Sequence, residues 1–294
     1  ETSPLSWLHL TAGARYDDIT YDAEDVFNNT TSSVSFSEFS PKAGLTLDLP
    51  FEQTFWFNYS FGFSPPSSSL LFTNSIADAS LKPERVENLE IGFRGSLIED
   101  KLNYEIAYYN ADVTDYVVNE PTGVFSRGRE IMRSINAGKV NLQGLETSLR
   151  YSPIEYLRFE VAHTFQVNEF IDYVDRGVNL SGNRVATSPE HTVNARVTVI
   201  PVDKLNIEFE VNASTEYHTN SDNSLDPKGT YQRPAMFNLR TSYEWGPTEL
   251  WLHAINLTDE RTPRVSYSTR GGGGRSYSSI EEPLTIYGGV AFKF

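Results

Sequence analysis

Cysteine is absent from this chain of 294 residues, and methionine occurs only twice. Without cysteine, neither a disulfide framework nor a metal site built from thiolates can form. Basic residues are also scarce: 24 Lys and Arg stand against 39 Asp and Glu, which gives a net charge of -15. Nucleic acids and anionic membrane surfaces repel a chain this acidic, so we expect no nucleic-acid partner.

Long apolar stretches are missing as well. No run of about 18 consecutive apolar residues occurs, which excludes membrane-spanning helices. Residues 53–77 carry no charge, but they contain Pro65-Pro66 and show period-two alternation, so we reject a helix there. The first five residues have neither a basic nor an apolar leader segment. We therefore expect no signal peptide and regard the chain as a mature protein or an excised piece.

Signatures of catalysis and metal binding are absent too. The five histidines are not paired at metal-ligand spacing, and no HExxH motif occurs. The run from Gly271 to Gly274 lacks the Gly-Lys-Ser/Thr ending of a phosphate loop, so it is better interpreted as a flexible outer loop. No Gly-x-Ser-x-Gly elbow is present. We expect no enzyme activity, no metal site and no cofactor.

The dominant pattern is alternation of apolar and polar residues. Apolar Leu205, Ile207 and Phe209 alternate with polar Asn206 and Glu208, which predicts a strand with one apolar and one polar face. The same pattern recurs along the chain and predicts about twelve strands, at 5–21, 34–49, 51–64, 85–98, 101–118, 131–151, 156–173, 187–201, 204–218, 231–244, 248–266 and 281–294. Several exceed the usual length of soluble strands, about 5–6 residues, and suit a tilted bilayer crossing of about 9–11 residues.

Short and long connections strictly interleave. Short turns are predicted at 50, 98–100, 152–155, 202–203 and 245–247, and long connections at 22–33, 65–84, 119–130, 174–186, 219–230 and 267–280. Tight turns at one end and long loops at the other are typical of an all-β, antiparallel, transmembrane up-and-down β-barrel. A soluble sandwich has no reason to place every long loop at one end.

The end of the chain carries a further signal. Its last strand has apolar residues at every second position and ends in Phe292 and Phe294. A terminal strand of this kind resembles the signal by which outer-membrane proteins are recognised for barrel assembly. An ordinary edge strand is the alternative, although six apolar positions on an uncovered edge would favour aggregation.

Several short motifs resemble those of TonB-dependent receptors, in the same order and over nearly the whole chain. They are Tyr59-Ser60 with Gly62-Phe63 and Pro65-Pro66-Ser67, Leu81-Lys82-Pro83-Glu84 with Asn88, Glu90 and Gly92, Asn136-Ala137-Gly138-Lys139 with Gln143-Gly144-Leu145-Glu146, and Asn256-Leu257-Thr258-Asp259-Glu260. The resemblance implies a barrel of about 22 strands around an N-terminal plug. Residues 1–294 would then be the C-terminal portion of that barrel, without the plug and the TonB-contacting box. Because lipid does not tolerate two open sheet edges, the chain is expected either to be incomplete or to close as a smaller barrel.

The resemblance also implies a place and a function. It places the chain in the outer membrane of a Gram-negative bacterium, in contact with lipid and with the barrel assembly machinery. The expected function is TonB-dependent uptake of a scarce nutrient, with a ferric siderophore favoured over haem, cobalamin or an oligosaccharide. A passive porin, a 12-stranded secretion translocator and a truncated barrel without activity of its own are the alternatives.

Ligand would bind at the outer end of the barrel, where cationic and aromatic side chains suit an anionic, aromatic ferric siderophore. The candidates are Arg127, Arg129, Arg133, Tyr217, His218, Tyr267, Arg270, Arg275 and Tyr277. The simpler interpretation is that these arginines balance acidic loop residues and that the tyrosines mark the membrane interface. Charges predicted for the inner face are expected to contact the plug or to pair with one another; they are Arg94, Glu105, Arg158, Glu160, Arg196, Glu208, Glu210 and Arg240.

Overall fold

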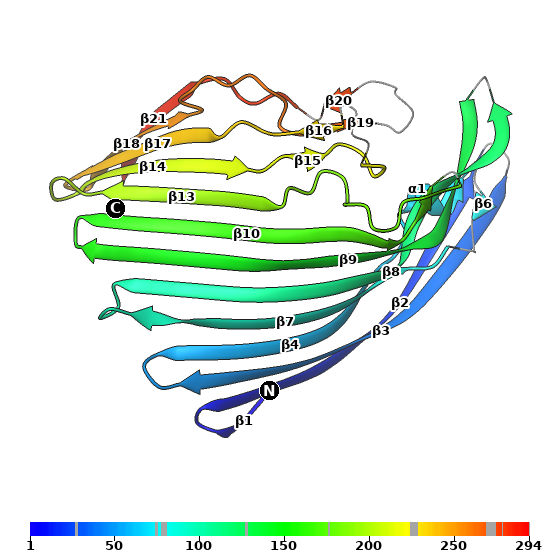
Figure 1. Ribbon diagram of the computed structural model, residues 1–294, viewed down its shortest axis with the longest axis horizontal. Helices are drawn as coiled ribbons and strands as arrows, with labels where there is room; N and C mark the ends of the chain where they lie inside the picture. Colours follow the sequence, from blue (N-terminus) through cyan, green and yellow to red (C-terminus); the bar gives the residue numbers. More distant parts are fainter. Residues whose placement is uncertain are drawn as a thin grey trace.

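The chain forms one antiparallel sheet of 13 strands in which sequential strands are neighbours (Figure 1). The computed structural model describes residues 1–26, 29–73, 76–77, 81–126, 129–175, 177–223, 229–268, 275–277 and 279–293. The strands of the sheet are β1 (Thr2–Leu5), β2 (Leu8–Asp25), β3 (Thr30–Leu49), β4 (Gln53–Ser64), β7 (Glu84–Leu97), β8 (Leu102–Ser126), β9 (Arg129–Ile154), β10 (Leu157–Asp172), β13 (His191–Val199), β14 (Leu205–Ser214), β17 (Met236–Trp245), β18 (Thr248–Ile255) and β21 (Thr285–Phe292). Twelve of these correspond to the twelve predicted strands, and β1 is an additional short edge strand.

The connections alternate between two ends of the sheet, as the sequence predicts. Tight turns gather at the end where both termini lie, and the long connections gather at the opposite end (Figure 1). The long connections contain one helical turn and four short hairpins: α1 (Ser68–Leu71), β5 (Phe72–Thr73) with β6 (Ile76–Ala77), β11 (Val174–Asp175) with β12 (Val178–Asn179), β15 (Tyr217–His218) with β16 (Thr230–Tyr231), and β19 (Ser266–Ser268) with β20 (Arg275–Tyr277). Of the helical segments in the described part, none has the length and apolar character to cross a membrane.

Two predicted loops are wrong. Residues 22–33 and 119–130 were expected to be long connections, but β2 and β3 stay paired up to Asp25 and Thr30, and β8 and β9 up to Ser126 and Arg129. Main-chain hydrogen bonds continue a ladder without apolar side chains, so the strands outlast the alternation that reveals them. The opposite error occurs near the C-terminus, where the strand predicted at 248–266 ends at Ile255.

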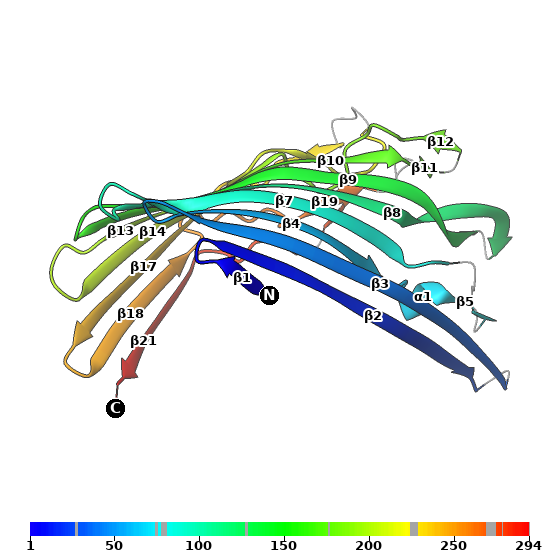
Figure 2. The same cartoon turned by 90° about the horizontal axis from the view of Figure 1, so that it is seen from below.

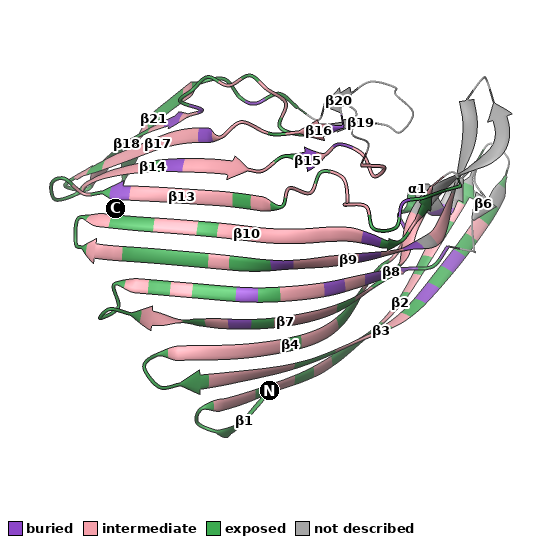
Figure 3. Ribbon diagram, viewed as in Figure 1, coloured by how far each residue is buried: buried purple, intermediate pink, exposed green. Residues whose placement is uncertain are grey.

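The sheet is strongly arched and open, with β1 and β21 at its two edges (Figure 2). It has no single core. Buried positions are few and scattered along the strands (Figure 3). Two apolar clusters are formed by the described residues, one of Val34, Phe36, Leu71 and Leu81 and one of Val113, Val140 and Phe170. Both involve the strand ends near the long connections, where α1 and the 173–185 segment cover the sheet.

The two faces of the sheet differ sharply. The register pairs Arg94 with Glu105 and Glu160 with Arg196, which places the predicted inner-face charges on one face. The other face exposes large apolar side chains, each between 37% and 42% exposed: Ile91, Ile106, Leu149, Phe159 and Phe209. An apolar band this continuous is typical of a lipid-facing barrel wall. The predicted assignment of residues to the two faces is therefore confirmed.

Two tryptophans of the charged face lie over glycines of the neighbouring strand. Trp56 is paired with Gly92, and Trp251 with Gly289. A Cβ atom built on Gly92 would lie 2.0 Å from Trp56 Cζ2, and one on Gly289 would lie 2.5 Å from Trp251 Cζ2. Each indole therefore occupies space that any side chain on the opposite strand would need.

Candidate functional site

The charged face carries a network centred on Glu210. The carboxylate of Glu210 is only 6% exposed and accepts hydrogen bonds from the side-chain amides of Asn194 (2.7 Å) and Asn238 (3.2 Å). Arg240 Nη2 lies 3.2 Å from the Glu210 carboxylate, and Arg196 Nε lies 3.5 Å from it. Neighbouring strands β13, β14 and β17 each contribute to this network, so it ties the wall together across strands.

The network continues toward β9 and β10. Arg240 Nη1 also donates to Glu208 at 2.8 Å, and Glu160 pairs with Arg150 (2.8 Å) and Arg158 (3.7 Å). Six of the eight charges predicted for the inner face thus pair among themselves, which fits the prediction of an internal salt-bridge network. Each of these charges would cost more if it stood in the wall without its partner.

Arg94 and Glu105 behave differently. Arg94 lies over the Trp56 ring with its Cζ 5.8 Å from the ring centroid, while Trp56 Nε1 donates to Glu90 at 2.7 Å. In the described part of the chain, neither Arg94 nor Glu105 forms an ion pair. Both line an open cavity of about 650 Å³ on the charged face.

Two family motifs meet in space at the outer end. Asn136 Nδ2 donates to the carbonyls of Lys82 (2.9 Å) and Asp115 (2.6 Å), and its Oδ1 accepts from the Lys82 amide at 2.7 Å. Glu84 accepts from the Val117 amide at 2.8 Å. The LKPE segment is therefore fastened to the irregular stretch of β8 and β9. These motif residues therefore tie two separate segments of the chain together.

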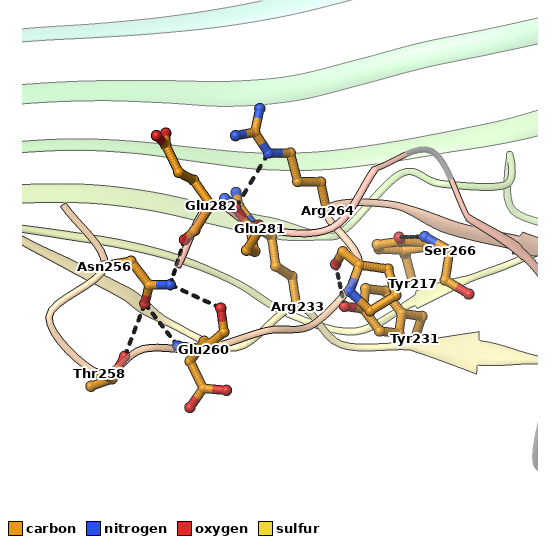
Figure 4. Close-up of polar contacts among 11 residues, drawn as sticks. Tyr217, Tyr231, Arg233, Asn256, Thr258, Glu260, Arg264, Ser266, Glu281 and Glu282 are labelled. Carbon is orange, nitrogen blue, oxygen red and sulfur yellow. Dashed lines mark hydrogen bonds and ion pairs between the residues drawn. The ribbon is translucent and has the colours of Figure 1, made fainter. Parts of the chain in front are cut away.

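Asn256 is the centre of a third motif and is fully buried. Its side-chain Nδ2 donates to the backbone carbonyls of Glu260 (2.8 Å) and Glu282 (2.7 Å), and its Oδ1 accepts from the Glu260 backbone amide at 3.0 Å (Figure 4). The backbone of Asn256 has a φ of 57°, a left-handed conformation that asparagine tolerates better than most residues. Asn256 therefore closes the base of the long connection between β18 and β21.

Asp259 reinforces this closure. Its Oδ1 accepts from the Leu284 amide at 2.9 Å, and its Oδ2 pairs with Arg261 at 2.9 Å. The Leu284 hydrogen bond, followed by Arg261, holds the pKa of Asp259 below its ordinary value. Both polar residues of the Asn256-Leu257-Thr258-Asp259 turn therefore hold this connection in place.

The predicted ligand residues fall into two groups. Tyr217 is buried, its hydroxyl accepts from the Ser266 amide at 3.0 Å, and its ring packs edge-on against Tyr231 with 5.7 Å between centroids. Burial raises the pKa of the Tyr217 hydroxyl. The His218 carbonyl accepts from the Thr187 amide at 2.8 Å, and His218 Nδ1 is buried without a hydrogen-bond partner in the described part.

The structure brings several of these predicted residues together. Because Tyr217 binds the backbone of β19, the first group contains β15, β19 with Tyr267, and β20 with Arg275 and Tyr277. Arg129 and Arg133 belong to a separate group on β9, in the long hairpin with β8. Arg127 and Arg270 lie outside the described residues, as do the side chains of Arg129, Arg133, Tyr267, Arg275 and Tyr277.

Of the two predicted assembly residues, Phe292 lies at the other end of the sheet. Phe292 pairs with Thr248 beside a tight turn, and its side chain points to the apolar face with 61% exposure. Phe294 lies outside the described residues. The position of Phe292 suits the predicted signal strand, and its role in assembly stays a prediction.

Sequence reasoning missed a cluster of Arg233, Arg264 and Glu281. The Glu281 carboxylate is 5% exposed and contacts Arg233 Nε at 2.5 Å and Arg264 Nε at 3.4 Å. The cluster lines an open cavity of about 410 Å³ together with Asn212, Met236, Asn238, Ile255, Asn256, Val265 and Glu282. The three residues are far apart in sequence and follow no periodic pattern, so only the folded arrangement reveals them. Among the described residues, no group of three or more His, Asp or Glu is placed to hold a metal ion.

Comparisons with known proteins agree with this architecture. The chain is 27% identical over 251 residues to the ferric-pyoverdine M114 receptor PbuA of Pseudomonas sp. (strain M114), which covers 82% of this chain and 28% of that protein. The structure resembles the siderophore receptor PiuA from Acinetobacter baumannii, with a TM-score of 0.76, 16% identity, and coverage of 98% of this chain and 41% of that one. It also resembles the ferric-catecholate import receptor Fiu from K12 E. coli, with a TM-score of 0.72, 17% identity, and coverage of 99% and 43%.

The chain thus spans under a third of that receptor's length and about two fifths of the two solved structures. A family model described as TonB dependent receptor-like, beta-barrel, matches residues 3–287. That match covers nearly every strand of the sheet, and we conclude that the chain belongs to the TonB-dependent receptor-like β-barrel family.

Proposed function

We propose that this chain forms part of the barrel wall of an outer-membrane receptor that imports a ferric siderophore with energy supplied through TonB. The observation that carries the proposal is the two-faced sheet of a chain that belongs to this family. The exposed apolar face would contact lipid, and the paired charges would line the interior. A plug domain and the TonB contact would come from the N-terminal part of the whole receptor.

Several observations support a siderophore as the cargo. The curated relative is named a ferric-pyoverdine receptor, and the two solved proteins are named a siderophore receptor and a ferric-catecholate import receptor. The wall of this chain offers arginines and tyrosines at the end with long connections, where a ligand arriving from outside would meet the receptor first. This proposal favours a receptor over the porin and translocator alternatives and requires no catalytic group.

Deletion of the gene that encodes the chain tests this proposal. Under iron restriction, the deletion strain should lose growth on one ferric siderophore and lose uptake of radioactive iron from it. Deletion of tonB should abolish the same uptake. Unchanged uptake of every iron source in the first strain would contradict siderophore import, and uptake that persists without TonB would indicate a passive pore.

The predicted contact residues are tested within the full receptor. Alanine at Arg129 and Arg133, or at Arg275 and Tyr277, should weaken uptake if that group contacts the ligand. Alanine at Lys293 is the matched control, because Lys293 pairs with Glu244 at the end with tight turns. A group whose loss leaves uptake at the level of the Lys293 variant does not contact the ligand.

A further inference from the structure

The cavity beside Glu281 lies on the charged face at the outer ends of β14, β17 and β18. Its lining includes Asn212, whose Oδ1 accepts from Asn194, and Asn238, whose side-chain amide donates to Glu210 and accepts from the Asn256 backbone. Its rim carries Arg233 and Arg264. Figure 4 shows the Arg264 side chain reaching beyond Glu281, away from the Asn256 turn. Arg233 and Arg264 are the cationic side chains that a molecule bound in this cavity would meet.

The position of Arg264 is fixed by its own backbone and both flanks. The Tyr231 hydroxyl donates to the Pro263 carbonyl at 2.5 Å, and the Ser266 amide donates to the Tyr217 hydroxyl at 3.0 Å. The Arg264 amide donates to the Ser279 carbonyl at 2.8 Å. A backbone held this way does not need to be ordered when a ligand binds, so less binding energy is spent on forming the site.

The two arginines have unused hydrogen-bonding capacity. A guanidinium group carries five N–H donors in a planar fork, and within the described part of the chain each of these arginines uses only Nε, on the one carboxylate of Glu281. The side chains of Arg233 and Arg264 are 36% and 52% exposed, whereas Glu281 is 5% exposed. Two guanidinium groups on one carboxylate give the Arg233–Arg264–Glu281 cluster a net positive charge, which the carboxylate of Glu282 offsets within the same cavity.

Glu282 is the other charged residue lining this cavity. Its carboxylate accepts from the Tyr287 hydroxyl at 2.6 Å. Because its charge opposes that of the arginines, it would repel an anion at the rim. This opposition makes Glu282 a useful sensor of whether the site takes anions at all.

We propose that Arg233 and Arg264, held by Glu281, form an anion-binding site for the carboxylate or catecholate oxygens of a negatively charged ferric chelate. The planar fork of arginine matches such paired oxygens, and charge-assisted hydrogen bonds to it are strong. The inference rests on the proposed function, because it names the chemistry of the cargo. Tyr217 and Tyr231 act as positioning residues that hold the segment carrying Arg264.

The test uses the purified full-length receptor in detergent, with binding followed by quenching of tryptophan fluorescence. The probes are ferric citrate and a ferric tris-catecholate, which are anionic, together with neutral ferrichrome and cationic ferrioxamine B. We expect at least one anionic probe to bind best, more weakly at higher salt. R264A and R233A should each weaken that binding about tenfold or more, and R264K should retain part of it.

Two further variants separate anion binding from a purely structural role. E282Q should tighten the anionic probe, because it removes the opposing charge without touching either arginine contact. R261A is the matched control, since Arg261 is an exposed arginine of the same connection that pairs with Asp259 instead. Heat-modifiable mobility on gels confirms that each variant is folded.

Preferential binding of ferrichrome or ferrioxamine B, or failure of both anionic probes, would overturn the inference. So would folded R264A and R233A proteins that bind like R261A, or an E282Q protein with unchanged affinity. Uptake of radioactive iron by cells is measured separately. Binding that behaves as expected without any uptake would sink the importer proposal while leaving the anion site in place.

Discussion

Replacing Gly92 by alanine should destabilise the barrel wall through Trp56. The new Cβ would lie 2.0 Å from Trp56 Cζ2, against a normal carbon–carbon contact of about 3.5 Å, so the indole must move by about 1.5 Å. That shift breaks the 2.7 Å hydrogen bond from Trp56 Nε1 to Glu90, which is worth about 1.5–3 kcal/mol. It also disturbs the Arg94 contact with the ring, worth about 0.5–1 kcal/mol. We expect a loss of about 2–4 kcal/mol in the free energy of unfolding.

Gly62 supplies the matched control, because it lies on β4 on the same face as Trp56. A Cβ there meets no atom within 4 Å, so Gly62→Ala should be neutral or stabilise by about 0.4–1 kcal/mol through the unfolded chain. Both variants are made in the full-length receptor, and denaturant unfolding in detergent is followed by heat-modifiable gel mobility. In a Trp56→Ala background, Gly92→Ala should cost almost nothing. A Gly92→Ala protein as stable as Gly62→Ala, or a cost that persists without the indole, would refute a clash with Trp56.

Three other perturbations follow from the polar networks. Asn256→Ala should lower the free energy of unfolding by about 2–4 kcal/mol, because several buried backbone groups lose their partner. Asn256→Asp should cost less. Equal costs measured by denaturant unfolding would contradict the role of the Asn256 side chain in closing this connection. Glu210→Ala should cost about 2 kcal/mol, since it leaves Arg196 without a carboxylate and Arg240 with Glu208 alone. Glu210→Gln should recover part of that loss, and a stable alanine variant would argue against the network. The pKa of Asp259 is lower in the folded chain than in the unfolded chain, so the stability that Asp259 contributes is present above the unfolded pKa and disappears as pH falls through the folded pKa. Proteolysis of the 257–284 connection should therefore increase at acidic pH in the wild type. Asp259→Asn should remove this pH dependence.

The strands of the central band were predictable because a membrane wall enforces strict alternation. Residues such as Phe209 and Glu210 must face opposite environments, and the sequence records that requirement at every second position. Tight turns were equally visible, because the alternation breaks off for only a few residues there. The extended hairpin tops of β2–β3 and β8–β9 were not, since strands outside the lipid carry mixed side chains such as the Thr and Ser of 30–33.

The site was predictable only in part. Composition drew attention to arginine and tyrosine in the outer connections, but it did not reveal that the Tyr217 hydroxyl binds the Ser266 backbone. Nor could it reveal that Arg233, Arg264 and Glu281 meet, because their contacts depend on how three separate segments fold over the strand ends. Cross-strand contacts such as Trp56 over Gly92 depend on register, which one sequence does not state.

The exact pairing of residues across neighbouring strands has a consequence for how such a chain can evolve. Adding or removing one residue within β14 would turn every later side chain of that strand to the opposite face, exchanging Glu208 and Glu210 with Phe209 and Val211. The carboxylates would then face lipid. The residues of β13 and β17 that pair with them would be destabilised as well. A change of two residues keeps the faces and shifts only the partners. Evolution should therefore tolerate insertions and deletions freely in the outer connections, but within the strands only those of an even number of residues.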